Sequence, residues 1–533
     1  MNFKRTILPF LFLASMASSH SYAIFIDGHG SYSLRGETRT KPGFSSESGV
    51  YQAVEQFFRL DTEIRTSDKA SFFLEFDLFD NSRESHLGDS SSLNECPQEI
   101  TAAGPYTNTN QGRNTSCVGA QQNSIEPRYN SMTPRVKKAY AQYAMDFCLL
   151  TVGRRGRDWG MGMILDSGKD PFDTDASIYD GVTCDINIQK SQTLGFSFGY
   201  DKITETGATV LTSSEADSTT YGPTNKNDDL DQIFVTLEYN DHKMNVGKGF
   251  SQQIGIYFAN VFGGKSTGTD IKIADLYLNF IISDLVIQNE VLFRLGDSAD
   301  PNLALLGGVR SRDLETEIKN NVQSIAAAGS IEYYLSRSGT VVGPAKYKQG
   351  NAVSHSLFFD YAYAPGDEHG YYPEYSDNFS ISPRDTSVKA VAFHRNFKPA
   401  MLLFNGKSSS DSLRIDGIFD PYRVMNASVL SLGYRYKSLS NGNFEIRAVT
   451  ANLMEGISDE AKALYTDAND RPVGYHGTDL GAEIDIIYTK SLGQGLEIGV
   501  AGAVSKAGNA WKIKDSESPA DNLLLQSHVS FSF

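Results

Sequence analysis

The segment 522–533, NLLLQSHVSFSF, constrains the fold most, because its side chains largely alternate between apolar and polar. Leu523, Leu525, Val529, Phe531 and Phe533 share one face, and Asn522, Gln526, His528, Ser530 and Ser532 share the other. Such alternation predicts a strand with one apolar and one polar face. A strand at the end of a chain needs a partner to stay ordered. A closed barrel, in which the last strand pairs with the first, provides that partner and leaves no free edge. The pattern therefore predicts that Phe533 helps to close a barrel with an apolar outer face and a polar lumen; the alternative is a soluble β-sandwich.

The first 23 residues predict a secretory signal. Lys4 and Arg5 precede an apolar run at 7–17 that is too short to span a bilayer, and 21–23 reads Ser-Tyr-Ala, a small-x-small cleavage site. We expect residues 1–23 to be removed and residues 24–533 to form a single domain. No later segment holds 18 consecutive apolar residues, so the only membrane-spanning form open to the chain is a barrel.

Strand-like alternation recurs along the whole chain. The expected strands lie near 24–36, 50–66, 69–79, 134–147, 149–165, 181–190, 192–203, 229–239, 251–262, 268–281, 285–296, 322–336, 351–364, 386–404, 424–437, 441–453, 478–489, 493–506 and 522–533. Because single-chain bacterial barrels have even strand numbers, we predict roughly 18 strands in an all-β, antiparallel transmembrane barrel. Tight turns near 146–148 and 491–493 contrast with long polar connections at 80–133, 204–228, 297–321, 365–385 and 454–475. Short periplasmic turns and long extracellular loops are typical of such barrels.

The polar faces of these strands carry charges of both signs, which favours a wet lumen over a dry core. The pore-lining candidates are Arg59, Arg65, Glu75, Asp77, Arg154, Asp158, Glu290, Arg294, Arg435, Arg447, Glu483 and Asp485. Rings of one sign select ions, whereas this mixed set predicts only a mild cation bias from an acidic chain. Arg154 and Asp158, four residues apart, are expected to share a face as an ion pair or a solute contact.

The four cysteines predict one disulfide. Cys96 and Cys117 flank a polar loop, and an exported chain meets an oxidising compartment, so we pair them. Cys148 is expected at a periplasmic turn and Cys184 near an extracellular end, a separation that disulfide geometry would forbid. No CxxC motif or nearby His pair indicates a metal site.

Three segments resemble a known family. Residues 149–183, LLTVGRRGRDWGMGMILDSGKDPFDTDASIYDGVT, are similar to a signature of the alginate-export family of outer-membrane porins. Residues 476–505 resemble its C-terminal hairpin, and 358–368 resemble it more weakly. The resemblance implies a wide barrel of about 18 strands, a charged lumen and solute passage. The mixed lumen departs from an arginine-lined pore for a polyanion, so the resemblance carries no substrate.

The first of these segments also has physical interpretations of its own. Its glycines permit kinks, bulges or close approach by another loop. Trp159 suits an interfacial girdle, although it could equally pack on a neighbouring loop. The five aspartates of the loop at 166–180 could hold Ca²⁺, but EF-hand spacing is absent and a solvated or self-capped loop is the alternative. No other cofactor is indicated.

These observations favour a passive channel for small or oligomeric hydrophilic solutes, including charged sugars, in the outer membrane of a Gram-negative bacterium. Its expected partners are membrane lipid, the barrel assembly machinery and the solute. A net charge of −16 argues against nucleic acid. The Gly-x-Ser-x-Gly pattern at 195–199 lies mid-strand, where a nucleophile elbow cannot form, so we expect no enzyme. An adhesin or receptor acting through the long loops is the alternative. The sequence leaves open the solute, the direction of transport and the oligomeric state.

Overall fold

The computed structural model describes residues 24–41, 44, 50–78, 83–84, 135–170, 173, 175–187, 194–204, 230–241, 249–263, 268–298, 320–338, 353–366, 374–375, 381–382, 387–405, 423–438, 440–456, 477–511 and 519–533. The predicted signal at 1–23 lies outside these ranges and stays a prediction.

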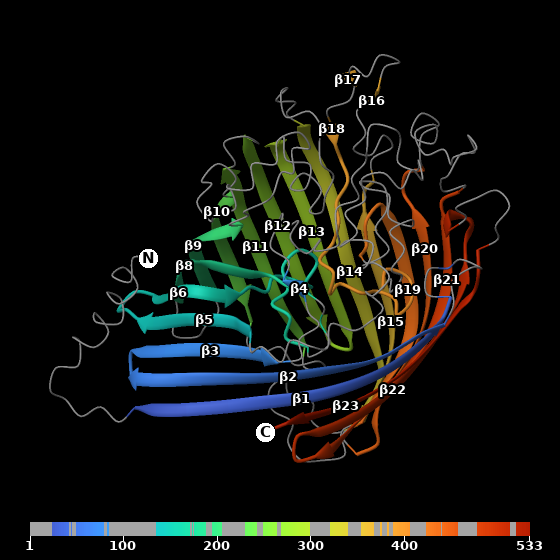
Figure 1. Ribbon diagram of the computed structural model, residues 1–533, viewed down its shortest axis with the longest axis horizontal. Coiled ribbons are helices and arrows are strands. Elements are labelled where there is room, and N and C mark those ends of the chain that lie inside the picture. The colour runs from blue at the N-terminus through green and yellow to red at the C-terminus, as the bar shows by residue number, and fades with distance from the viewer. Residues whose placement is uncertain are drawn as a thin grey trace, which may run out of the picture.

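The described chain forms a closed antiparallel barrel of 18 strands, which confirms the predicted fold (Figure 1). The barrel strands are β1 (Phe25–Thr40), β2 (Val50–Ser67), β3 (Ala70–Leu78), β5 (Arg135–Ala144), β6 (Leu149–Gly156), β8 (Ile178–Asn187), β9 (Leu194–Thr204), β10 (Leu230–Asn240), β11 (Phe250–Gly263), β12 (Thr269–Ile282), β13 (Leu285–Ser298), β14 (Asn320–Ser338), β15 (Val353–Ala364), β19 (Ala427–Ser438), β20 (Gly442–Leu453), β21 (Asp479–Gly493), β22 (Leu496–Ala507) and β23 (Asn522–Ser532). The remaining elements are β4 (Arg83–Glu84), β7 (Asp175–Ala176), β16 (Glu374–Tyr375), β17 (Ile381–Ser382), β18 (Ser387–Val388) and the 3-10 helix η2 (Asn509–Trp511).

The last strand closes the barrel by pairing with the first. β23 is antiparallel to β1 from Ser532 opposite Ser31 to Leu523 opposite Thr40. Beyond the strand, Phe533 and Gly30 exchange two backbone hydrogen bonds of 2.9 Å. The ring of Phe533 covers Gly30 so closely that a Cβ at position 30 would overlap it.

The two ends of the barrel differ in their connections. Two residues separate β2 from β3, β12 from β13 and β21 from β22, all at the end where β1 begins. At the other end, β3 and β5, β13 and β14, and β20 and β21 are joined by far longer stretches. This is the predicted pattern of short periplasmic turns and long extracellular connections.

The outer face of the wall is apolar. Large exposed side chains recur at every second position; examples are Phe72, Val152, Val182, Phe198, Ile233, Phe258, Phe293, Ile325, Leu432, Ile484 and Leu525. Such a belt suits contact with lipid. None of the helical residues that the structure describes forms a helix long and apolar enough to cross a membrane.

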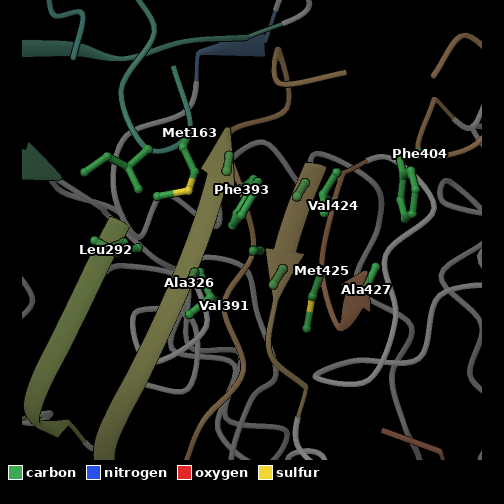
Figure 2. Close-up of a cluster of buried hydrophobic side chains, with 14 of the residues drawn as sticks. Met163, Leu292, Ala326, Val391, Phe393, Phe404, Val424, Met425 and Ala427 are labelled. Carbon is green, nitrogen blue, oxygen red and sulfur yellow. The ribbon is translucent and has the colours of Figure 1, made fainter. Parts of the chain in front are cut away.

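One predicted strand is too long and another is largely absent, and both errors have the same cause. The stretch 149–165 leaves the wall after Gly156, and of 386–404 only β18 pairs, in parallel with β14. The apolar residues of these stretches pack inside the barrel, where Met163, Val391 and Phe393 are fully buried beside wall residues such as Ala326 (Figure 2). The core of this protein therefore lies in its lumen.

Candidate functional site

Two pieces of chain fold inward and pack against the inner face of the wall. The first inward segment, residues 157–177, connects β6 to β8, and the second inward segment, residues 389–405, follows β18. Residues 423–426 run beside the second segment, where Phe393 donates its N–H to the carbonyl of Val424 at 2.9 Å. Both segments pack apolar side chains into one buried cluster.

Trp159 fastens the beginning of the first inward segment to the wall. The indole Nε1 donates a 2.8 Å hydrogen bond to Oδ1 of Asp275 on β12, and the ring lies 5.6 Å from that of Tyr257 on β11. The wall makes room for it at Gly255, where a Cβ would lie 2.9 Å from the indole. Trp159 is thus buried against the inner face of the wall, so the girdle interpretation is wrong, and its printed contacts are with strands rather than with the neighbouring loop of the alternative.

Charged wall residues bind the backbone of the same segment on two sides. Glu290 on β13 accepts the N–H of Met161, and a Cβ at Gly160 would overlap its carboxylate. Across the lumen, the guanidinium of Arg59 and the ammonium of Lys137 donate to the carbonyl of Gly168, at 3.0 and 3.3 Å. Carboxylates therefore hold N–H groups and cations hold a carbonyl.

The second inward segment is held in the same way. Glu483 on β21 accepts three consecutive N–H groups, those of Met401, Leu402 and Leu403, at 2.7–2.8 Å. Arg39 on β1 donates through Nη1 to the carbonyl of Asn405 at 2.5 Å. Hydrogen bonds to charged groups are roughly twice as strong as neutral ones, so these contacts fix the segment's backbone.

Most of the remaining inward charges are paired with each other. Arg59 binds Asp77 through two nitrogens at 2.8 and 3.1 Å, and its Nε lies 3.2 Å from Glu75. Arg435 pairs with Glu445 at 2.8 Å, and Arg447 with Asp485 at 2.7 Å. Nearer the short turns, Arg65 is half-exposed and pairs with Glu63. Arg294 is buried on the inward face of β13.

Two of the pore-lining candidates lie elsewhere. Arg154 follows Val152 by two residues, so it shares the outer face, where it pairs with Asp180 at 3.0 Å. Asp158 lies in the first inward segment, pairs with Lys169 and accepts the N–H of Ser167. The predicted shared face of Arg154 and Asp158 is therefore wrong, because β6 ends between them.

Sequence reasoning missed the arginines that do face inward there. Arg155 and Arg157 both pair with Asp201 on β9, at 3.3 and 2.7 Å. The guanidinium of Arg157 also lies 3.3 Å from the ring centroid of Phe234. The Arg-Arg-x-Arg run 154–157 shows where to look, but only the end of β6 decides which of its members face the lumen.

The acidic loop at 166–180 caps itself rather than staying free in water. Asp166 accepts the N–H of Gly168 at 2.7 Å, and Asp173 accepts the N–H of Asp170 at 2.9 Å. Burial raises the pKa of Asp173 to about 7, and the charges of Asp166 and Asp170 act in the same direction. Within the described ranges, no three acidic, His or Cys side chains gather as metal ligands would.

The disulfide lies between the two cysteines for which it seemed forbidden. Cys148 and Cys184 are bonded, with their Cα atoms 5.6 Å apart. β6 already ends at Gly156, and β8 begins at Ile178 and runs back antiparallel to β6 towards the short-turn end, where Cys184 lies opposite Leu150 and so beside Cys148. The error followed from the overlong strand at 149–165. Cys96 and Cys117 lie outside the described residues, so their pairing stays a prediction that peptide mapping would test.

Comparisons with known proteins give likeness in solved structures alone. No family model and no curated protein matches the chain. OccK8 (OprE) of Pseudomonas aeruginosa is 13% identical, covers 95% of this chain and 98% of its own, and has a TM-score of 0.45. OccAB2 of Acinetobacter baumannii is 11% identical, covers 97% and 99%, and has a TM-score of 0.45. The outer membrane protein OprD of P. aeruginosa is 10% identical, covers 95% and 94%, and has a TM-score of 0.44.

The resemblance to the alginate-export family is wrong. No model of that family matches, and the similar solved structures are OprD and Occ proteins instead. The quoted motif 149–183 holds the end of β6, the first inward segment and the start of β8. The closed barrel and its apolar belt place the protein in a Gram-negative outer membrane.

Proposed function

We propose that the protein is a non-enzymatic outer-membrane channel through which small hydrophilic solutes pass passively. A barrel of 18 strands is wide enough to leave an aqueous channel. The observation that supports the proposal is that both inward segments are fixed to the wall, so that the lumen is narrowed at a defined place. The passage is the part of the lumen that these segments leave open.

The paired wall charges favour weak charge selectivity. Arg59, Arg435 and Arg447 each lie within 3.2 Å of a carboxylate, so a solute meets dipoles more than isolated charges. The segments set the size limit, and charged sugars are one solute class to compare with neutral ones. The adhesin or receptor alternative depends on long loops that lie mostly outside the described residues.

The test is ion passage in planar bilayers, with the reversal potential measured across a salt gradient. Lys437 follows Arg435 by two residues on β19, so it shares the inward face, and its side chain is exposed. Arg154→Glu, which makes the same change of charge on the outer face, is the matched control. Lys437→Glu should move the reversal potential modestly towards cations at low salt, and hardly at 1 M, because screening acts within about 3 Å there. Arg154→Glu should leave it unchanged.

A protein that passes no ions would refute the channel. Equal shifts in the two variants would show that charge acts through the whole field of the protein rather than along the passage. Liposome swelling with neutral and charged sugars then ranks the solutes by size and sign.

A further inference from the structure

The contact of Glu483 with the second inward segment resembles an occupied anion site. Consecutive backbone N–H groups that point at one spot form a concavity that binds anions. Here Met401, Leu402 and Leu403 present three such groups, and the wall's own carboxylate fills the concavity. Glu483 is 1% exposed, which leaves no room for an outside anion.

Glu290 on β13 plays the same part for the first inward segment. It is fully buried, accepts the N–H of Met161 and lies against Gly160, whose missing side chain lets the carboxylate approach. Gly160 has a φ of +56°, a conformation that glycine adopts at low cost. A glycine at position 160 therefore allows the carboxylate of Glu290 to reach the backbone of the first inward segment.

The two anchored segments also hold each other. The N–H of His394 donates to the carbonyl of Met163 at 2.7 Å, and Nδ2 of Asn396 donates to Oδ1 of Asp166 at 3.1 Å. The first of these hydrogen bonds is at Met163, two residues after Met161, whose N–H Glu290 accepts. Met163 and Phe393 belong to the same buried apolar cluster (Figure 2).

We infer that Glu290 and Glu483 are positioning residues that hold the two inward segments as one unit, so that loss of either anchor loosens both segments and widens the passage. The statement about passage rests on the proposed channel function, whereas the coupling of the segments does not.

Hydrogen–deuterium exchange of the protein in detergent tests the coupling. Glu483→Gln replaces one acceptor oxygen by a donor, so it faces one N–H with another. Exchange at 401–403 should rise at least about tenfold, as expected when a hydrogen bond to a charged group is lost. Exchange at 161–165 should rise as well, although Glu290 is intact. Glu290→Gln should produce the reciprocal effect at 401–403.

Two further variants make the result specific. Glu63→Gln changes a wall carboxylate that pairs with Arg65 and should leave both segments protected. Asn396→Ala removes the side-chain hydrogen bond to Asp166 that links the two segments, and it leaves Glu290 and Glu483 unchanged. In the double variant with Glu483→Gln, the rise in hydrogen exchange at 161–165 should therefore be smaller. Heat-dependent gel migration identifies variants whose barrel is folded.

Passage provides the second readout. Liposome swelling should show that Glu483→Gln and Glu290→Gln admit larger neutral sugars relative to small ones, whereas Glu63→Gln does not. If hydrogen exchange rises only in the segment that the mutated glutamate binds, the claim that the two segments behave as one unit is wrong, even if the channel conducts. Unchanged size selectivity with both segments loosened would overturn their effect on passage. A wild-type protein that conducts nothing would refute the channel while leaving the exchange result valid.

Discussion

Side chains at position 255 should disturb Trp159 increasingly with their size, because the indole occupies the space above Gly255. A Cβ there would lie 2.9 Å from the indole Cη2 and 3.2 Å from Cζ2. Gly255→Ala forces a small shift, with a cost of about 1–3 kcal/mol as in other overpacked sites. Gly255→Val adds two methyl groups and should expel the ring. Expulsion would expose about 150–250 Å² of aromatic surface, worth about 4–6 kcal/mol, and break the bond to Asp275.

Tryptophan fluorescence measures this directly, because the chain has only two tryptophans. In a Trp511→Phe background, emission reports Trp159 alone. Gly255→Val should shift the emission to longer wavelength and increase quenching by iodide, with a smaller effect for Gly255→Ala. Gly36→Ala is the matched control, since its Cβ would meet only Ser527 Oγ at 3.5 Å. Unchanged emission in Gly255→Val would refute the position of the Trp159 indole over Gly255.

Three other predictions concern closure, the disulfide and pH. Gly30→Val should hinder barrel closure by displacing the terminal Phe ring, whereas a Cβ at Gly28 would meet only the carbonyl oxygen of Asp61 at 4.0 Å; equal heat-modifiable migration of Gly30→Val and Gly28→Val would contradict this. Replacing Cys148 and Cys184 by Ser removes a crosslink spanning 36 residues and should lower the free energy of unfolding by about 4 kcal/mol in the chain-entropy model; an unchanged denaturant midpoint would count against it. Because the pKa of Asp173 is raised from 3.8 to about 7, the folded segment keeps a proton that the unfolded chain releases. Protection of the first inward segment should therefore fall as pH rises from about 4 to 7, and Asp173→Asn should abolish that fall.

The sequence predicts the wall well because alternation determines strand faces. Glu75 and Asp77, and likewise Glu483 and Asp485, lie two residues apart on β3 and β21, so their inward direction follows from period two. The same rule fails at Arg154, whose apolar neighbours alternate with it on the outside. Charge alone does not identify a lumen face where the outer rim is also charged.

The inward segments could not be predicted from periodicity. Their apolar residues, such as Met163 and Leu403, resemble strand residues in composition, but they are buried by contacts far away in the chain. Long-range packing also determines which groups the charged side chains of the wall bind. Glu290, Glu483 and Arg59 bind backbone groups of the segments, which explains why a mixed set of signs lines this barrel.

The central claim is that the inward segments narrow the lumen, and single-channel conductance tests it most directly. The variant to compare replaces 158–176 by a short Gly-Ser turn between β6 and β8, which leaves the disulfide in place. We expect the intact protein to conduct with a small unitary current at 1 M salt, and the shortened protein to conduct severalfold more. Equal conductance in the two folded proteins would show that the first inward segment does not limit passage, and would contradict the account.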